Sequence, residues 1–271
     1  MKKKIGGLTL AWEDTGPRSA GPVVLLHAFP LNKRMWEAQR NELSQRFRVI
    51  TPDFRGHGES EGPQEDSTME RLAEDVRGLL DALRLPRVVL GGLSMGGYAA
   101  FAFYRRHAAR VAALVLADTR AQADTNEGRQ ARYQLAALAE KEGSGAVAER
   151  LLPKLLAPST QESQPEIVAA VREMILSTPP AGIVRALRGM AGRADSGPLL
   201  PTIHCPTLIL VGEQDTLTPP ADSEAMAKAI PRAQLELIPG AGHLSNIEQP
   251  GRFTDLLQDF LARLRPASFG G

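Results

Sequence analysis

The sequence predicts an α/β fold, in which a mostly parallel sheet is flanked by helices and carries an inserted helical cap. Short apolar runs rich in β-branched residues alternate with amphipathic stretches, as is typical of strands joined by crossover helices. Few polar residues interrupt these runs, which indicates strands covered on both faces. The alternation stops after Asp118 and resumes near His204. We therefore expect residues 1–118 and 204–271 to form the core and residues 119–203 to form the cap.

The first part of the chain supplies most of the predicted sheet. Its expected strands cover residues 8–12, 22–27, 47–52, 88–93 and 111–117. Amphipathic spacing predicts a helix over residues 35–46. A second helix is expected to open at Ser67-Thr68-Met69-Glu70, which has capping-box spacing. The loop over residues 53–60 is rich in turn residues and follows a buried strand.

The second part begins with a long stretch that has no convincing strand. Its expected helices cover residues 127–142, 146–156, 165–177 and 179–192. These helices could instead belong to the covering layers of the sheet, but the missing strands favour an insertion. Strands over 206–212 and 233–238 and helices over 220–230 and 250–264 then complete the fold. Residues 265–271 are expected to be a disordered tail.

Composition excludes several classes of protein. The chain has 271 residues, of which 43% are hydrophobic and 23% charged, with a net charge of +1. This balance favours neither nucleic acid nor an acidic membrane surface as a partner. No apolar run reaches membrane-spanning length, and the single cysteine cannot form an intramolecular disulfide. The basic start at Met1 lacks the apolar region of a signal peptide. We expect a cytoplasmic protein, either monomer or homodimer.

The strand over 88–93 runs directly into the pattern Gly92-x-Ser94-x-Gly96, and a helix follows. Where a strand is followed by a sharp turn and then a helix, this pattern is typical of a nucleophile held on a strained turn. The glycines relieve crowding around the serine, and the helix start directs free N–H groups towards it. The alternative is a glycine-rich turn with an incidental serine.

A serine hydroxyl needs a base near pH 7, and histidine is best suited to this role. His243 lies in a loop after the last predicted strand, at the edge where the other strands also end. The other candidates are less well placed or have no orienting carboxylate nearby; they are His27, His57, His107 and His204.

Asp215 follows the penultimate strand and is the expected orienting acid, although it could merely cap the next helix. Asp118 and Glu213 are the alternatives. The order Ser94, Asp215, His243 is the one expected for a nucleophile elbow on an α/β sheet.

Two backbone N–H groups are needed to bind the oxyanion of an acyl-transfer reaction. Met95, directly after the serine, is expected to supply one of them. Phe29, in the loop after the strand over 22–27, is expected to supply the other, because Pro30 has no N–H.

Together these motifs resemble the α/β-hydrolase fold superfamily, and the resemblance spans nearly the whole chain. It rests on the segments 27–30, 53–60, 92–97, 212–215 and 240–243. The sequence is most similar to small cap-bearing carboxylesterases and 3-oxoadipate enol-lactonase-like hydrolases. One departure is Ala28, where the family usually has glycine, and its methyl group could narrow the oxyanion loop.

The resemblance implies a serine hydrolase that cleaves small apolar carboxylic esters without a cofactor or metal. An enol-lactonase or other lactone hydrolase is the alternative, and Phe29-Pro30 is similar to perhydrolases of the family. A small-ligand receptor and an interaction scaffold are hypotheses of other classes. Ser94 argues against haloalkane dehalogenases and epoxide hydrolases, which use aspartate as the nucleophile.

The expected substrate pocket lies under the cap. Its predicted lining residues are His27, Tyr133, Leu138, Leu187, Leu217 and Leu244. Arg185, Arg188 and Arg193 could bind a substrate carboxylate, but a solvated helix face is the favoured interpretation for them.

Overall fold

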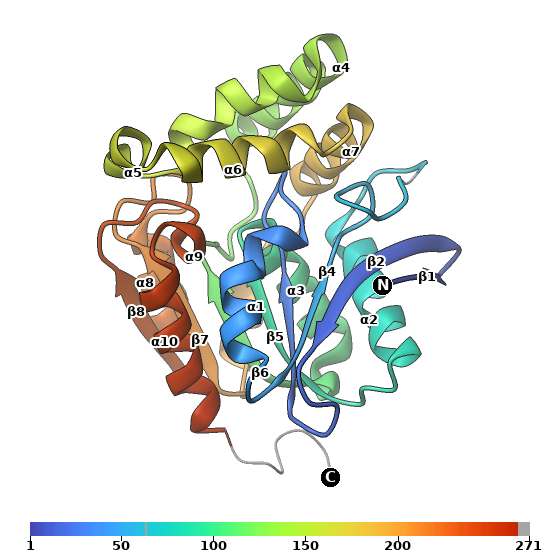
Figure 1. Cartoon of the computed structure of the whole chain (residues 1–271), viewed down its shortest axis with the longest axis vertical. Coiled ribbons are helices and arrows are strands. Elements are labelled where there is room, and N and C mark those ends of the chain that lie inside the picture. Colours follow the sequence, from blue (N-terminus) through green and yellow to red (C-terminus); the bar gives the residue numbers. More distant parts are fainter. Residues whose placement is uncertain (63, 265–271) are drawn as a thin grey trace.

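The computed structural model describes residues 1–62 and 64–264 and contains a central eight-stranded sheet (Figure 1). The strands are β1 (Lys2–Ile5), β2 (Leu8–Thr15), β3 (Pro22–Leu26), β4 (Arg48–Pro52), β5 (Val88–Leu93), β6 (Val111–Ala117), β7 (Thr207–Gly212) and β8 (Ala233–Ile238). Their order is β1-β2-β4-β3-β5-β6-β7-β8. All neighbouring pairs from β4 to β8 are parallel, whereas β1 and β2 are antiparallel additions. The predicted mostly parallel α/β sheet is confirmed.

Helices cover both faces of this sheet, and a further group lies above one of its edges (Figure 1). They are α1 (Glu37–Leu43), α2 (Met69–Ala82), α3 (Met95–His107), α4 (Asn126–Leu155), α5 (Pro158–Ser163), α6 (Pro165–Leu176), α7 (Pro180–Ala191), α8 (Pro220–Ala229), α9 (Ser245–Glu248) and α10 (Pro250–Ala262). Three short 3₁₀ segments span Lys33–Trp36, Ala108–Arg110 and Gly197–Thr202. Helix α1 packs against α10, and α2 packs against α3. Strands β3 to β7 are buried along their whole length, so the core lies on both sides of them.

Helices α4 to α7 form a separate layer above the edge at which the parallel strands end (Figure 1). Residues 119–206, all of which the structure describes, contain no strand. Two predicted helices are merged into α4, with Gly143 at φ 79° marking the break between them. Helix α5 was not predicted, because its sequence has no clear apolar face.

Two further differences from the sequence prediction have simple causes. Strand β1 was missed because its lysines are exposed on an edge strand, which therefore lacks an apolar pattern. Helix α2 is capped by Thr68 rather than Ser67, since the Thr68 side chain accepts from the Arg71 N–H. The predicted disordered tail, residues 265–271, lies outside the described residues.

Within the described residues, no single helix has the length and apolar character needed to cross a bilayer. Only α6 and α7 taken together meet both criteria, and they are bent by 90° relative to each other.

Candidate active site

Ser94 lies on a sharp turn between β5 and α3. Its backbone has φ 55° and ψ −113°, a conformation that costs a residue with a Cβ on the order of 1–3 kcal/mol. The turn is packed tightly against neighbouring backbone. A Cβ on Gly96 would lie 2.2 Å from the carbonyl oxygen of Leu26, and one on Gly92 would lie 2.2 Å from Gly96. The strained turn is therefore possible because glycine occupies both flanking positions.

A chain of hydrogen bonds joins Ser94 to His243 and Asp215. Ser94 Oγ lies 2.9 Å from His243 Nε2, and His243 Nδ1 lies 2.8 Å from Asp215 Oδ2. A carboxylate can only accept, so Nδ1 carries the proton and Nε2 is free to accept from the serine hydroxyl. The three residues come from three loops at the same sheet edge.

Asp215 is fixed from several sides. Its Oδ1 accepts from the N–H groups of Leu217 and Thr218 at 2.8 and 3.0 Å, and its Oδ2 accepts from the Thr218 hydroxyl at 2.6 Å. Burial alone would raise the pKa of this carboxyl. The charge of His243 and the hydrogen bonds from His243 and Thr218 outweigh burial and hold the pKa below its usual range. Asp215 is therefore ionised at neutral pH.

The other histidines considered as bases do not contact Ser94. His107 lies 3.0 Å from Glu74. His57 is buried, and burial lowers its pKa to about 3. His27 accepts from the Phe54 N–H through Nε2 at 2.9 Å, and its Nδ1 lies 2.9 Å from the Ala28 carbonyl. His27 is completely buried, so its predicted place in the pocket lining is wrong; it braces the loop after β3.

Asp118, the alternative acid, follows β6 and is fully buried. It accepts from the Gly212 N–H at 2.8 Å and from the Ser245 hydroxyl, so it joins the loop before Asp215 to the loop after His243. Burial raises its pKa well above the usual range, and the charge of Asp215 raises it further. Asp118 thus holds its proton in the folded protein over a wider pH range than in the unfolded chain.

Replacing Asp118 with Asn is expected to flatten the pH dependence of the free energy of unfolding above about pH 4. In the unfolded wild type, Asp118 releases its proton near the ordinary carboxyl pKa of 3.8, whereas the folded state keeps this proton to higher pH. The free energy of unfolding therefore falls as the pH rises, until the folded-state pKa of Asp118 is passed. Asparagine cannot titrate and can still accept from Gly212. Urea denaturation between pH 4 and 8 would measure both slopes. Equal slopes in the two proteins would contradict this account of Asp118.

Glu248 connects the histidine loop to the α4–α7 layer. Its buried carboxylate accepts from the Gly242 N–H at 2.8 Å and from the Ala157 N–H at 2.7 Å. A backbone hydrogen bond of 3.1 Å from Leu244 N to Leu155 O lies alongside. Leu244 is therefore bonded directly to the last residue of α4, and Gly242 is joined through Glu248 to Ala157, just before α5.

The loop after β3 lies beside the serine turn. The Phe29 N–H has no hydrogen-bond acceptor within residues 1–62 and 64–264, and the Phe29 side chain reaches the cavity above Ser94. Met95 is the first residue of α3, where an N–H has no partner inside the helix. Ala28 is completely buried, and its N–H contacts Met35 Sδ at 3.1 Å.

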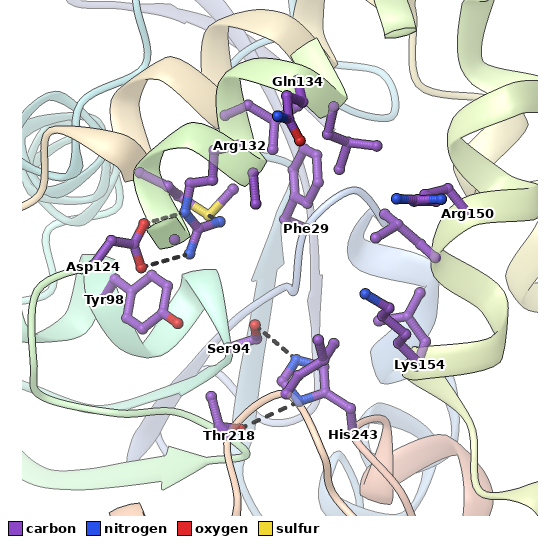
Figure 2. A pocket seen from close by; sticks show the side chains of 18 of the residues that line it. Phe29, Ser94, Tyr98, Asp124, Arg132, Gln134, Arg150, Lys154, Thr218 and His243 are labelled. Carbon is purple, nitrogen blue, oxygen red and sulfur yellow. Dashed lines mark hydrogen bonds and ion pairs between the residues drawn. The ribbon is translucent and has the colours of Figure 1, made fainter. Parts of the chain in front are cut away.

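A cavity of about 490 Å³ lies between Ser94 and the α4–α7 layer (Figure 2). Its apolar lining includes Leu135, Leu138, Leu151, Leu155, Leu187, Met190 and Leu217. The sequence prediction named Leu138, Leu187 and Leu217, which are among these lining residues. It was wrong for Tyr133, which is 52% exposed and outside the lining, and for Leu244, which is fully buried beneath it.

Sequence reasoning missed the polar part of the lining. Figure 2 shows Tyr98, Asp124 and Arg132 on one side of the cavity and Arg150 and Lys154 on the other. Arg150 and Lys154 lie one helical turn apart in α4, beside the apolar lining residues Leu151 and Leu155. This closeness in sequence was the one signal from which their place in the lining could have been predicted.

The three arginines that were considered for substrate binding lie outside this lining. Arg188 is exposed and pairs with Glu140, in agreement with the solvated-face interpretation, whereas Arg185 is half-buried and lies 4.0 Å from Asp66. Arg193 differs, because it is buried against Asp124 and stacks over Tyr98. No group of three or more metal-binding side chains is present in the part of the chain that the structure describes.

Comparison with known proteins agrees with this geometry. Residues 21–250 match the family described as alpha/beta hydrolase fold. A 3-oxoadipate enol-lactonase from Acinetobacter baylyi is 32% identical over 259 residues, covering 96% of this chain and 95% of the relative.

Two solved structures are similar over nearly their whole length. A thermophilic esterase from Thermogutta terrifontis, with malate bound, is 47% identical with a TM-score of 0.94, covering 97% of this chain and 98% of the other. An enol-lactonase from Burkholderia xenovorans is 34% identical with a TM-score of 0.91, covering 97% and 100%. The resemblance inferred from the sequence motifs is confirmed, and the chain belongs to the alpha/beta hydrolase fold family.

Proposed function

We propose that this chain is a serine hydrolase that cleaves small carboxylic esters through a covalent acyl-enzyme. The observation that carries the proposal is the hydrogen-bonded series Ser94, His243 and Asp215, of which Ser94 and His243 line the cavity. Esterase and enol-lactonase relatives that align along nearly the whole chain support the same reaction class.

In the proposed mechanism, Ser94 Oγ attacks the ester carbonyl while His243 Nε2 takes the serine proton. Asp215 stabilises the resulting imidazolium and keeps its orientation. The N–H groups of Met95 and Phe29 bind the oxyanion of the tetrahedral intermediate. His243 then gives its proton to the departing alkoxide, and water repeats the sequence to release the acid and free the serine.

The same steps open a lactone, in which case the alcohol and the acid remain parts of one molecule. The enol-lactonase relatives favour this second substrate class. In both reactions the α4–α7 layer serves as a lid, because it lies over Ser94 and supplies most of the cavity's apolar wall (Figure 2).

Turnover of aryl esters with two-, four- and eight-carbon acyl groups would test the proposal, together with labelling by a serine-directed phosphonate. We expect multiple turnovers and one phosphonate per chain, located on Ser94 by peptide mass spectrometry. Labelling at another residue would contradict the assigned nucleophile. A folded protein that turns over neither esters nor lactones would contradict the proposed function.

A further inference from the structure

The Phe29 N–H, a proposed oxyanion donor, belongs to the peptide unit that also contains the Ala28 carbonyl. A trans peptide unit is planar, so its N–H and C=O groups point in opposite directions. The Ala28 carbonyl accepts from the Leu31 N–H at 3.0 Å, and His27 Nδ1 lies 2.9 Å from the same oxygen. The direction of the Phe29 N–H therefore depends on what holds Leu31 and His27 in place.

These two groups are held from different parts of the molecule. His27 is completely buried and is braced within the core by the Phe54 N–H. The Leu31 N–H shares a peptide unit with the Pro30 carbonyl, and this carbonyl accepts from Thr178 Oγ1 at 2.8 Å. Thr178 lies between α6 and α7, so the second support comes from the helical layer above the sheet (Figure 1).

Thr178 is itself held firmly within that layer. It is fully buried, its N–H donates to the Ile175 carbonyl at 3.1 Å, and its carbonyl accepts from the Ser144 hydroxyl at 2.6 Å. The Met174 carbonyl is a second acceptor near the Thr178 hydroxyl, but it lies 3.5 Å away. The shorter distance of 2.8 Å directs the hydroxyl proton to Pro30.

The helix that follows Thr178 packs directly on the core. A Cβ on Gly182 would lie 2.1 Å from the Gly56 carbonyl oxygen, so the two backbones are in contact there. About one turn further along α7, the Arg185 carbonyl accepts from the Ser67 N–H at 3.1 Å. The start of α7, two residues after Thr178, is therefore attached to the core as well as to the rest of the layer.

The hydrogen bonds of the loop after β3 form a continuous series of two peptide units. The series begins at the Thr178 hydroxyl, passes through the peptide unit of Leu31 and ends at the Phe29 N–H. Hydrogen bonds in such a series polarise one another, and each bond also restricts the orientation of the next unit. An oxyanion donor stabilises the transition state best when it is oriented before the reaction begins.

We propose that Thr178 is a positioning residue for the oxyanion site, and that it acts through the Pro30 carbonyl on the Phe29 N–H. Thr178 is not part of the cavity lining, so it acts without touching the substrate. This inference rests on the proposed function. It adds that the α4–α7 layer contributes to the stabilisation of the transition state as well as to the cavity wall.

The test is Thr178→Val, which replaces the hydroxyl by a methyl group of similar size. We expect kcat for an aryl butyrate to fall about 10- to 100-fold, somewhat less than on deletion of an oxyanion donor. Because the oxyanion forms in both acylation and deacylation, both steps should slow together and KM should stay within about twofold. Thr178→Ser keeps the hydroxyl and should retain at least about a third of the wild-type kcat. An unchanged kcat in Thr178→Val would overturn the proposal.

Thr51→Val is the matched control. Thr51 is also fully buried, but its hydroxyl has no hydrogen-bond partner in the part of the chain that the structure describes. The same exchange of hydroxyl for methyl should therefore leave kcat within about twofold of the wild-type value. Equal losses in the two valine variants would overturn the role of the bond to Pro30. If valine at position 178 prevents folding, Thr178→Ala removes the same hydroxyl without adding bulk and is judged by the same criteria.

A transition-state analogue separates positioning from a general loosening of the fold. Ser94 Oγ adds to the carbonyl carbon of an alkyl trifluoromethyl ketone, the serine proton moves to His243, and the carbonyl oxygen becomes an oxyanion. The inhibition constant should rise at least about tenfold in Thr178→Val and stay near the wild-type value in Thr178→Ser and Thr51→Val. The corresponding secondary alcohol forms no oxyanion and should bind all four proteins alike. Equal inhibition constants in Thr178→Val and the wild type would overturn this inference alone, whereas a wild type that neither turns over esters nor reacts with the ketone would overturn the proposed function itself.

Discussion

Ser94→Ala is expected to lower kcat for ester hydrolysis by at least about 10⁴-fold, because the acyl-enzyme can no longer form. The folded structure should persist, since alanine keeps the Cβ and removes only an oxygen that bonds His243 at 2.9 Å. Purified variant and wild type would be compared with an aryl butyrate, and circular dichroism would check the fold. A variant with more than a tenth of the wild-type kcat would exclude Ser94 as the nucleophile.

Ser94→Gly separates chemistry from backbone strain at the same position. It should be as inactive as Ser94→Ala but more stable, because glycine adopts φ 55° without a steric penalty. The expected gain over Ser94→Ala is about 1 kcal/mol in the free energy of unfolding, measured in urea. Equal stabilities would mean that the turn at Ser94 stores no strain.

Gly96→Ala is expected to lower the free energy of unfolding by about 3 kcal/mol or more. The new Cβ would lie 2.2 Å from the Leu26 carbonyl oxygen and 2.8 Å from the Leu26 carbonyl carbon. Both are backbone atoms of the buried strand β3, so they cannot move aside as a flexible side chain would. Any variant that folds should have the serine turn displaced from β3 and should lose ester turnover.

Gly251→Ala is the matched control for that substitution. Gly251 lies in the first turn of α10, and a Cβ there would meet nothing within 4 Å. Because alanine favours helix over glycine, the control should be neutral or slightly more stable. A loss of stability in Gly251→Ala comparable to that in Gly96→Ala would show that the close approach to Leu26 is not the cause.

The fold and the candidate catalytic residues could be predicted because their signals are local in sequence. The buried strands appear as uninterrupted apolar runs, and Gly92-x-Ser94-x-Gly96 lies directly between a strand and a helix. Parallel strands end at one edge, so loops that are distant in sequence had to meet there. That is why Asp215 and His243 could be matched to Ser94 without knowledge of their contacts.

The cavity lining could not be predicted in the same way, because it depends on how each helix of the α4–α7 layer is rotated and where it bends. The break at Gly143 sets the direction of the second half of α4, and nothing local fixes that direction. Tyr133 was expected to face inward as an aromatic residue, yet it is exposed. Arg150 and Lys154 contribute to the lining although their side chains remain exposed, and charged residues usually mark the solvent face.

The two hydrogen bonds that Glu248 accepts link the loop that carries His243 to the α4–α7 layer. One carboxylate accepts hydrogen bonds from both Gly242, next to the proposed general base His243, and Ala157, in the segment between α4 and α5 of the proposed lid. A lid that lifts must either break this bond or pull the histidine loop with it. If the loop follows the lid, His243 Nε2 leaves its position 2.9 Å from Ser94 Oγ; if the bond breaks instead, the buried Ala157 N–H loses its acceptor. Under the proposed mechanism, the opening of the cavity and the position of the base are therefore linked through this one carboxylate.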